Sequence, residues 1–393
     1  MTKKWSSRLT FFAFVVLMVG LGSNDSLRGI FSTIFQEHFS LTTTQLGLIV
    51  TASYIGNLVF LLVGGNLSTR FSKKRVLQVL ILIWMAALAL FAFTSNYTVL
   101  LIGMALALGS STLLNTTMNL ITPLLFATAP GFFVNFLFFT QEIGTSGSQY
   151  ILGSHADGFA FWQHTNLVLL ILGAVAFVLL LFCNVPEEAA APADAPADAP
   201  AQKGGYDWRI IVPYVLVFGF YFIAEHGVMN WMVAYGVDGL GLPQASAAKY
   251  LSVFFGGMMI GRLCLSPLVD KLGALKSLAA FGGVSCVLYL IGSLGGAVTM
   301  PIWAISGLSF SILYPTLVMS IRLYFPAQQV SGAAGTILSI ASLADILFNV
   351  GFGKLVDMTG YAVSIRVLPL SALAFFIVFI LFTKFCKPTQ KLK

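Results

Sequence analysis

The fold is decided by a stretch that occurs twice, first as Gly65-Asn-Leu-Ser-Thr-Arg70-Phe-Ser-Lys73-Lys74-Arg75 and again as Ser266-Pro-Leu-Val-Asp270-Lys271-Leu-Gly273-Ala-Leu-Lys276. Each copy is short and basic, and each directly follows a long apolar run. The two copies are separated by about half of the 393-residue chain. A repeat at this offset predicts two similar halves that run parallel to each other.

The sequence around these loops is 58% hydrophobic and only 9% charged, whereas a soluble domain is roughly 45–50% apolar. Twelve apolar runs reach about the 20 residues that one helical crossing of a bilayer needs. We expect the crossings at residues 9–33, 44–66, 76–94, 98–122, 131–153, 165–184, 209–235, 247–268, 276–294, 299–323, 332–354 and 366–385. Because the period-2 alternation of a membrane barrel is absent, the predicted fold is an all-α polytopic membrane protein with twelve transmembrane helices.

Residues 186–207 read PEEAAAPADAPADAPAQKGGYD, and this Ala/Pro/Asp composition is typical of a flexible linker. Six of the predicted crossings precede it and six follow it. We therefore predict an N-terminal six-helix half at residues 1–185, a cytoplasmic linker at 186–207 and a C-terminal six-helix half at 208–393.

The net charge of +7 is placed in a way that indicates membrane topology rather than a nucleic-acid partner. If both termini are cytoplasmic, 16 of the 21 Lys and Arg residues fall on the cytoplasmic side, as the positive-inside rule requires. We expect a multi-pass protein of a bacterial inner membrane, surrounded by the lipid bilayer and with both ends in the cytoplasm. We expect it to be monomeric and to bind no nucleic acid.

Four acidic side chains lie inside the predicted crossings, namely Asp25, Glu142, Glu225 and Asp345. A charge in the middle of a membrane is costly unless it is paired, hydrated or neutralised by a proton. Such residues usually mark the path of a solute or an ion. Their presence favours a membrane transporter.

Further polar residues recur at helical spacing along four of the crossings. The four stripes are Ser111, Asn115, Asn119 and Thr122; Asn135, Glu142, Ser146 and Gln149; Tyr214, Phe218, Tyr221, Glu225 and Met229, with Asn230 beside them; and Ser339, Ser342, Asp345 and Asn349. Small polar side chains also hydrogen-bond neighbouring membrane helices, which is the simpler explanation for any single Ser or Thr. For the carboxylates and grouped amides we favour a water-filled cavity. Amides beside aromatic faces suit a neutral polyol or sugar.

The repeated loop resembles the G-x-L-x-D-R-x-G-R-K-R loop of the major facilitator superfamily. The first copy departs from it at Thr69 and Ser72 and keeps Gly65, Leu67, Arg70 and the basic triplet that ends at Arg75. The second copy keeps Leu268, Asp270, Lys271 and Gly273, and the eleventh crossing ends on a further copy, Gly353-x-Leu355-x-Asp357-x-x-Gly360. The resemblance implies two six-helix halves that rock about a central site. It also implies structural or gating roles for Arg70, Arg75, Asp270 and Lys271.

Short motifs spread over the whole chain resemble one branch of that superfamily, the fucose–galactose–glucose:proton symporter family. They are Gly22-Ser-Asn24-Asp25, Ala224-Glu225, Gly256-Gly-Met-Met-Ile-Gly-Arg262 and Tyr314-Pro-Thr316. In that family a first-helix Asp is implicated in proton coupling, and polar groups of the fifth and seventh helices are implicated in the sugar site. Position by position, the resemblance implies proton coupling by Asp25 and sugar contacts from Gln141 and from Glu225 with Asn230.

The four polar stripes and the resemblance to the symporter family together define the candidate site residues. We expect proton coupling from Asp25, Glu225 and Glu142. We expect solute contacts from Asn24, Asn115, Asn119, Gln141, Tyr221, Asn230 and Tyr314. Arg28 and Asp345 are expected to have structural or gating roles.

Two positions depart from the family. Its fourth-helix Glu falls on Asn115, which does not titrate, and Arg28 lies one turn after Asp25, where the family usually has an apolar residue. A nearby cation favours the ionised carboxylate, so three interpretations stay open. Arg28 moves away in one state, coupling has moved to Glu142 or Glu225, or Asp25 and Arg28 form a permanent structural pair. His226 is expected to hydrogen-bond at a helix interface rather than to relay protons.

The leading prediction is proton-coupled symport of a neutral sugar or a similar small polar organic solute by alternating access, with the solute and protons as partners. The Phe-rich crossings and the missing fourth-helix acid leave open a proton-driven exporter of apolar or cationic compounds. A receptor that binds a solute without moving it is a third interpretation. The sequence displays no nucleophile–base pair, metal-ligand cluster or nucleotide-binding loop, so we expect no enzyme activity, metal or cofactor.

Overall fold

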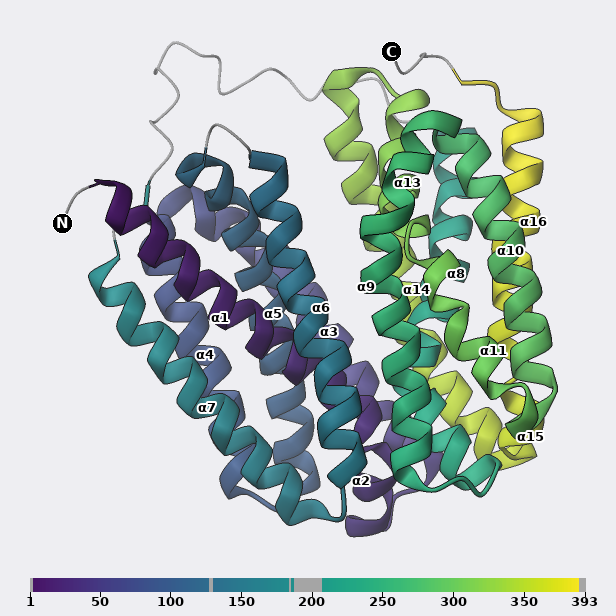
Figure 1. Ribbon diagram of the computed structural model, residues 1–393, viewed down its shortest axis with the longest axis horizontal. Helices are drawn as coiled ribbons and strands as arrows, with labels where there is room; N and C mark the ends of the chain where they lie inside the picture. The colour runs from purple at the N-terminus through teal and green to yellow at the C-terminus, as the bar shows by residue number, and fades with distance from the viewer. Residues whose placement is uncertain (1–2, 127–129, 184, 187–206, 389–393) are drawn as a thin grey trace. The chain divides into compact units, whose positions relative to one another are not determined.

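The computed structural model describes residues 3–126, 130–183, 185–186 and 207–388, and almost all of these residues are helical (Figure 1). The first seven helices are α1 (Lys3–Ile30), α2 (Ser32–His38), α3 (Thr43–Arg70), α4 (Lys73–Phe93), α5 (Tyr97–Leu125), α6 (Pro130–His155) and α7 (Phe159–Phe182). The longer helices that follow are α8 (Trp208–Ala234), α9 (Gln244–Leu272), α10 (Ala274–Leu294), α14 (Ala327–Thr359) and α16 (Val367–Phe385). The shorter ones are η1 (Tyr235–Gly239), η2 (Gly296–Val298), α11 (Met300–Ile305), α12 (Gly307–Phe310), α13 (Leu313–Ser320), η3 (Ile321–Leu323) and α15 (Tyr361–Ser364).

The predicted membrane crossings coincide with these helices. Within the described residues, eleven segments are long and apolar enough to span a membrane, and each overlaps one predicted crossing. The twelfth prediction, 131–153, coincides with α6, a helix of 26 residues that lies outside those eleven. The all-α polytopic fold expected from hydropathy is therefore confirmed.

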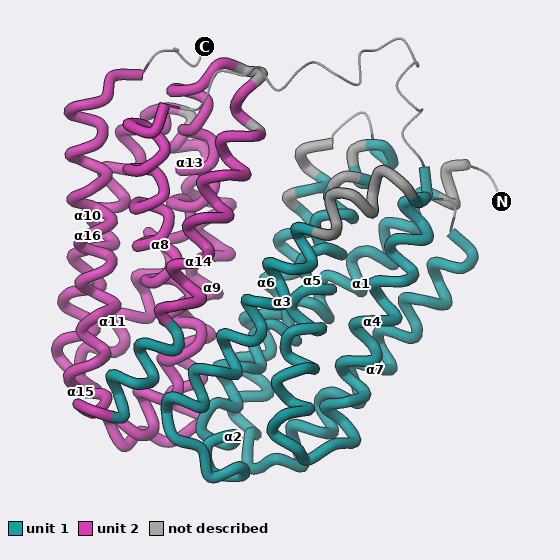
Figure 2. Tube along the Cα trace, turned by 180° about the vertical axis from the view of Figure 1, so that it is seen from behind, with its two compact units in different colours: residues 1–191, 349–357 teal, residues 192–348, 358–393 magenta. Residues whose placement is uncertain are grey.

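The chain folds into two compact units (Figure 2). Unit 1 comprises Met1–Ala191 together with Asn349–Asp357, and unit 2 comprises Pro192–Phe348 together with Met358–Lys393. The last turns of α14 thus group with unit 1, although they belong to the C-terminal half of the sequence. Of the predicted linker, 186–207, only Pro186 and Asp207 lie within the described residues.

The motif glycines and the motif aspartate have backbone roles. Gly273, between α9 and α10, and Gly360, between α14 and α15, have φ angles of 80° and 75°, which side-chain-bearing residues rarely adopt. Asp357, in the α14 segment of unit 1, accepts hydrogen bonds from the backbone N–H groups of Thr43 and Thr44, both at 2.7 Å. A carboxylate at a helix start is favourable because it bonds N–H groups that have no partner inside the helix.

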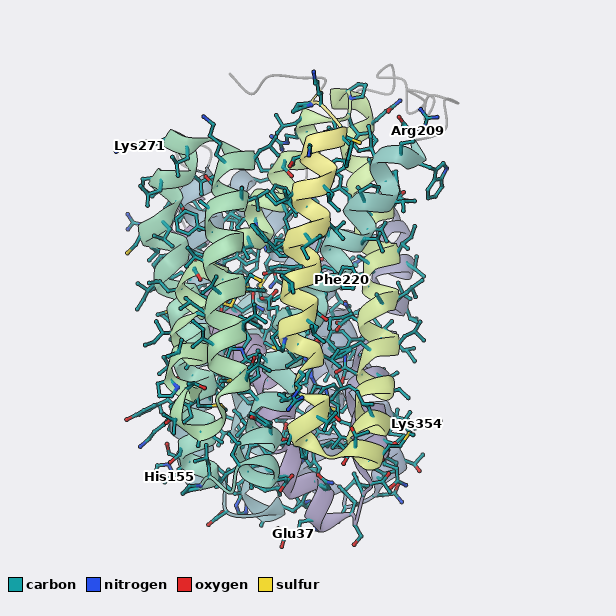
Figure 3. The ribbon with its side chains drawn as sticks, turned by 90° about the vertical axis from the view of Figure 1, so that its right-hand side faces the viewer. Glu37, His155, Arg209, Phe220, Lys271 and Lys354 are labelled. Atoms are coloured by element: carbon teal, nitrogen blue, oxygen red, sulfur yellow. The ribbon has the colours of Figure 1, made fainter. Side chains whose placement is uncertain are left out.

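Two basic residues that were predicted to lie on the cytoplasmic side are found at one end of unit 2. In unit 2, Arg209 at the start of α8 and Lys271 at the end of α9 lie at the same end, and Phe220 lies about midway along the unit (Figure 3). Lys271 and Arg75 are both exposed. The side chains of Arg70 and Asp270 lie outside the described part of the structure, so their predicted roles stay predictions.

Close backbone approaches set the helix positions inside each unit. In unit 1 a Cβ atom on Gly22 of α1 would lie 2.0 Å from the carbonyl oxygen of Gln141 on α6. In unit 2 a Cβ atom on Gly307 of α12 would lie 2.0 Å from the carbonyl oxygen of Phe254 on α9. A side chain at either position would push the two helices apart.

The tenth predicted crossing, 299–323, corresponds to α11, α12, α13 and η3, which follow one another with short turns at Ser306 and at Ser311–Ile312. The backbone of these three residues stays in the right-handed helical region, and hydrogen bonds to the residue four positions earlier continue through the turns. Together the segments form one stretch, Met300–Leu323, that is long and apolar enough to span a membrane, as predicted.

Candidate functional site

The first group of polar side chains lies in unit 1 and consists of three amides, Asn115 and Asn119 on α5 and Gln141 on α6. The Asn115 amide nitrogen donates a hydrogen bond to Gln141 Oε1 at 2.6 Å. The Asn119 amide nitrogen donates to Asn115 Oδ1, also at 2.6 Å. These three side chains, which we call the amide chain, are only partly buried. All three were predicted to contact the solute, and the structure brings them together.

Asp25 lies beside the same helix. The Ser111 hydroxyl on α5 donates to Asp25 Oδ2 at 3.2 Å. Arg28 is buried, and its positive charge acts on the Asp25 carboxylate. Its guanidinium also lies 5.5 Å from the ring centroid of Tyr54, within the range of a cation–π contact. Arg28 thus has an aromatic partner in addition to Asp25.

Two buried oxygens near these groups have no hydrogen-bond partner among the described residues. They are Oδ1 of Asp25 and Oδ1 of Asn119. Buried polar atoms are almost always hydrogen-bonded, so an acceptor left open inside a protein calls for a donor. A solute hydroxyl supplies one donor and two acceptor sites and so matches both the open oxygens and the amide chain.

The second group lies in unit 2 and is built on tyrosines. Tyr221 of α8 stacks on Phe310 of α12, with ring centroids 5.0 Å apart and planes at 17°. The Tyr314 ring of α13 lies 6.0 Å from Tyr221, nearly parallel to it. The Tyr289 ring of α10 also stacks on Phe310, with ring centroids 5.2 Å apart and planes at 22°. We call Tyr221, Tyr289 and Tyr314 the tyrosine cluster.

Charges of both signs surround the tyrosine cluster. Glu225 follows Tyr221 by one turn of α8, and its charge acts on the hydroxyls of all three tyrosines. Arg262 of α9 acts on Tyr221 and Tyr314. Tyr221 directly follows Phe220, which lies about midway along unit 2 (Figure 3).

A third contact joins two titratable groups of unit 2. The Nδ1 atom of His226 on α8 lies 2.6 Å from Oδ2 of Asp345 on α14. The Asp345 side chain is 2% exposed and that of His226 is 25% exposed. The prediction that His226 hydrogen-bonds across a helix interface therefore agrees with the structure, and its partner is one of the four acids found inside the predicted crossings.

The remaining predicted site residues lie on α1, α6 and α8. Asn24 is buried and accepts a hydrogen bond from the Trp84 ring nitrogen at 3.2 Å, which ties α1 to α4. Glu142 is partly buried on α6, one position after Gln141. Asn230 is 2% exposed on α8. Their predicted roles stay predictions.

Sequence reasoning did not select Tyr289, and it assigned Arg262 no part in the candidate site. Tyr289 is buried and donates a hydrogen bond to the carbonyl oxygen of Ala224 at 3.0 Å, next to Glu225. A single Tyr in an apolar crossing produces no polar stripe, so periodicity had no means of finding it. Arg262 ends the motif Gly256–Arg262, which the sequence analysis selected for its family resemblance, but the motif by itself does not indicate a role in the site.

Comparisons with known proteins agree with the fold. The model of the Major Facilitator Superfamily matches residues 10–344. The chain is 24% identical over 335 residues to the L-fucose-proton symporter of Escherichia coli (strain K12), covering 75% of each chain. It is 26% identical over 348 residues to a glucose/galactose transporter of Brucella abortus, covering 82% of this chain and 81% of that one.

A relative with a different solute is similar to a comparable degree. The cis,cis-muconate transport protein of Acinetobacter baylyi is 24% identical over 297 residues, covering 71% of this chain and 70% of the other. Among solved structures, that of a D-xylose-proton symporter superimposes with a TM-score of 0.78 at 16% identity, covering 97% of this chain and 98% of that one. At this identity the structural match bears on the fold alone.

Proposed function

Because the chain belongs to the Major Facilitator Superfamily and is a multi-pass membrane transporter, we propose that it carries a neutral sugar or similar small polar solute together with a proton. Transport would proceed by alternating access, in which the solute site opens to one side of the membrane at a time. We further propose that it works in a bacterial inner membrane with both termini in the cytoplasm, as the distribution of Lys and Arg favours.

The amide chain supports this proposal most strongly. Asn115, Asn119 and Gln141 present amide donors and acceptors at fixed spacing, and open acceptors on Asn119 and Asp25 lie beside them. A sugar offers hydroxyls that both donate and accept, so its hydroxyl pattern is read by such a set. In unit 2, the tyrosine cluster offers flat aromatic rings of the kind on which sugars stack, and a part in solute binding is proposed for it separately.

Two relatives are named for sugars, L-fucose in one case and glucose or galactose in the other. One of them is named as a proton symporter. The acids placed inside membrane-spanning helices are compatible with proton coupling, since a proton neutralises a carboxylate that would otherwise be costly in the bilayer.

The direct test is uptake by the purified protein in lipid vesicles with L-fucose, D-galactose and D-glucose as probes. Under an inward proton gradient we expect one of these sugars to accumulate with stereochemical preference, together with alkalinisation of the outer medium. A protonophore should abolish accumulation. Broad competition by apolar or cationic compounds would instead favour an exporter, and binding in detergent without uptake would favour a receptor.

A second candidate solute is an organic acid. One relative carries cis,cis-muconate in its name, and each polar group contains a guanidinium, Arg28 in unit 1 and Arg262 in unit 2. Guanidinium groups pair with carboxylates in a bidentate geometry. Uptake of cis,cis-muconate in the absence of uptake of the three sugars would support this candidate and overturn the first.

A further inference from the structure

The contact between His226 and Asp345 has features that a merely structural hydrogen bond does not need. Asp345 is 2% exposed inside a membrane-spanning helix, and the partner atom, Nδ1 of His226, lies 2.6 Å away. The two residues come from different helices of unit 2, α8 and α14. A neutral pair such as Ser and Asn would join the same helices without placing an acid in the membrane.

The contact also gives the two ring nitrogens of His226 different roles. When Nδ1 carries a proton and donates to the carboxylate, Nε2 is left as the atom that accepts or releases a further proton. The His226 side chain is 25% exposed, so the ring is not sealed inside the unit. The Phe222 ring lies nearly parallel to the imidazole, with centroids 5.3 Å apart and planes at 5°. The imidazole therefore has an aromatic neighbour on its own helix in addition to the carboxylate of α14.

One proton changes the net charge of the pair from −1 to zero. Neutral imidazole with an ionised Asp345 carries one negative charge, whereas imidazolium with the same carboxylate carries none. Because net charge in the bilayer is costly, the protonated pair is the cheaper one to move through the membrane's low-dielectric interior. Interacting groups of this kind take up and release the proton as a unit rather than as two independent residues.

Other titratable and charged groups lie on the described helices of unit 2. They include Tyr221 and Glu225 on α8, Arg262 on α9, Tyr289 on α10, Tyr314 on α13 and Lys384 in the last turn of α16. Glu225 and Arg262, which have opposite charges, both act on the tyrosine cluster. Asp345 is in direct contact with His226.

We propose that His226 and Asp345 form the proton-binding pair of unit 2, in which Nε2 of His226 takes up and releases the proton while Asp345 orients and stabilises the imidazolium. This inference rests on the proposed proton-coupled function. It assigns the proton to residues other than those proposed to bind the solute, because the pair shares no residue with the amide chain or the tyrosine cluster. It gives Asp345, expected from sequence to be structural, a positioning role, and makes His226 the group that titrates.

Proton binding is tested without any solute by nitrogen-15 NMR of histidine-labelled, full-length protein in lipid nanodiscs. The chain has four His residues, and the signal that disappears in His226→Gln belongs to the pair. We expect that signal to show a protonated Nδ1 throughout and to titrate at Nε2. In Asp345→Asn the imidazole should bind its second proton at least tenfold more weakly. An unchanged titration in Asp345→Asn would overturn the proposal.

Coupling is tested in vesicles with the same sugar probes. His226→Gln and Asp345→Asn should lose accumulation driven by a proton gradient and lose the accompanying alkalinisation, but keep sugar exchange at equal concentrations on both sides. Retained exchange shows that the variants fold. His155→Gln, a substitution at an exposed helix end in unit 1, should leave both activities unchanged. Gradient-driven accumulation at the wild-type level in both variants would overturn the proposal.

The two experiments separate the inference from the proposed function. If the wild-type protein moves none of the probes but the His226 titration depends on Asp345, the solute assignment fails and the proton-binding pair stands. If sugar accumulates with protons while the His226 signal ignores Asp345, the proposed function stands and this pair is not its proton site.

Discussion

The polar groups of the two units differ in chemistry, although the two halves of the sequence carry copies of one loop. In unit 1, three amides bond to one another and a hydroxyl donates to Asp25. In unit 2, tyrosine rings stack on Phe310 among charges of both signs, and His226 contacts Asp345. Two halves that carry copies of one loop can thus hold different polar chemistry, so the role proposed for each group has to be tested separately.

The contacts in both units depend on helix positions that close approaches at glycines set. The largest effect is therefore expected from adding a side chain at such a glycine. Gly144→Ala in unit 1 would place a Cβ atom 2.1 Å from the Val19 carbonyl oxygen, and Gly307→Ala in unit 2 would place one 2.0 Å from that of Phe254. Overpacking of this kind costs about 1–3 kcal/mol or more. Thermal unfolding in detergent should show a marked loss of stability in both variants.

Gly147→Ala is the matched control on α6, because a Cβ atom there meets nothing within 4 Å. It should be neutral or stabilising by about 0.5–1 kcal/mol, since Ala is the better helix former. Equal unfolding temperatures for Gly144→Ala and Gly147→Ala would show that the approach of α1 and α6 does not set the geometry of unit 1.

The next effect should come from the middle of the amide chain. Asn115→Leu removes the partner of both Gln141 and Asn119. Leaving buried polar groups unpaired costs about 1–3 kcal/mol, so sugar affinity should fall roughly 10- to 100-fold. Isothermal titration with the transported sugar measures the change. Thr116→Val, at an exposed position of the same helix, should bind the sugar with unchanged affinity. An unchanged sugar affinity in Asn115→Leu would show that the amide chain of unit 1 does not recognise the sugar.

The substitution Arg262→Gln distinguishes the two candidate solutes, a neutral sugar and an organic acid, by its effect on their affinities. If the solute is a neutral sugar, its affinity should change by less than about tenfold, which corresponds to 1.4 kcal/mol. If the solute is cis,cis-muconate, loss of a guanidinium that pairs with its carboxylate should cost more than that. Competition binding with both probes on the same preparation distinguishes the cases.

The smallest effect is expected from one hydroxyl of the tyrosine cluster. Tyr314→Phe keeps the ring beside Tyr221 and loses a group worth about 1 kcal/mol, or roughly fivefold in affinity. Tyr289→Phe is the comparison, because that hydroxyl already bonds to the Ala224 carbonyl oxygen. It should reduce thermal stability and leave sugar affinity unchanged. If Tyr289→Phe lowered sugar affinity and Tyr314→Phe did not, the hydroxyl that contacts the sugar would be that of Tyr289.

Part of the candidate site was accessible from the sequence because it follows helical spacing. Asn115 and Asn119 are four residues apart, which places them on one face of a helix, and the structure joins them by a hydrogen bond. Asn24 shows the limit of this reasoning. It adjoins Asp25 in the sequence, but consecutive residues point in different directions on a helix, and Asn24 bonds Trp84 inside unit 1.

Contacts between distant helices had no counterpart in the sequence patterns. His226 and Asp345 were both noticed as polar residues inside crossings, yet nothing in the sequence indicates that they meet at 2.6 Å.

The sequence by itself determined the membrane class, the helical crossings and the resemblance to a family, because hydropathy, charge placement and loop motifs are properties of segments read one at a time. Tertiary structure alone decided which polar groups share a hydrogen bond. That outcome depends on the rotation of each helix about its axis and on close approaches such as the one at Gly22. Both arise from packing between residues more than 100 positions apart, as between Gly22 and Gln141.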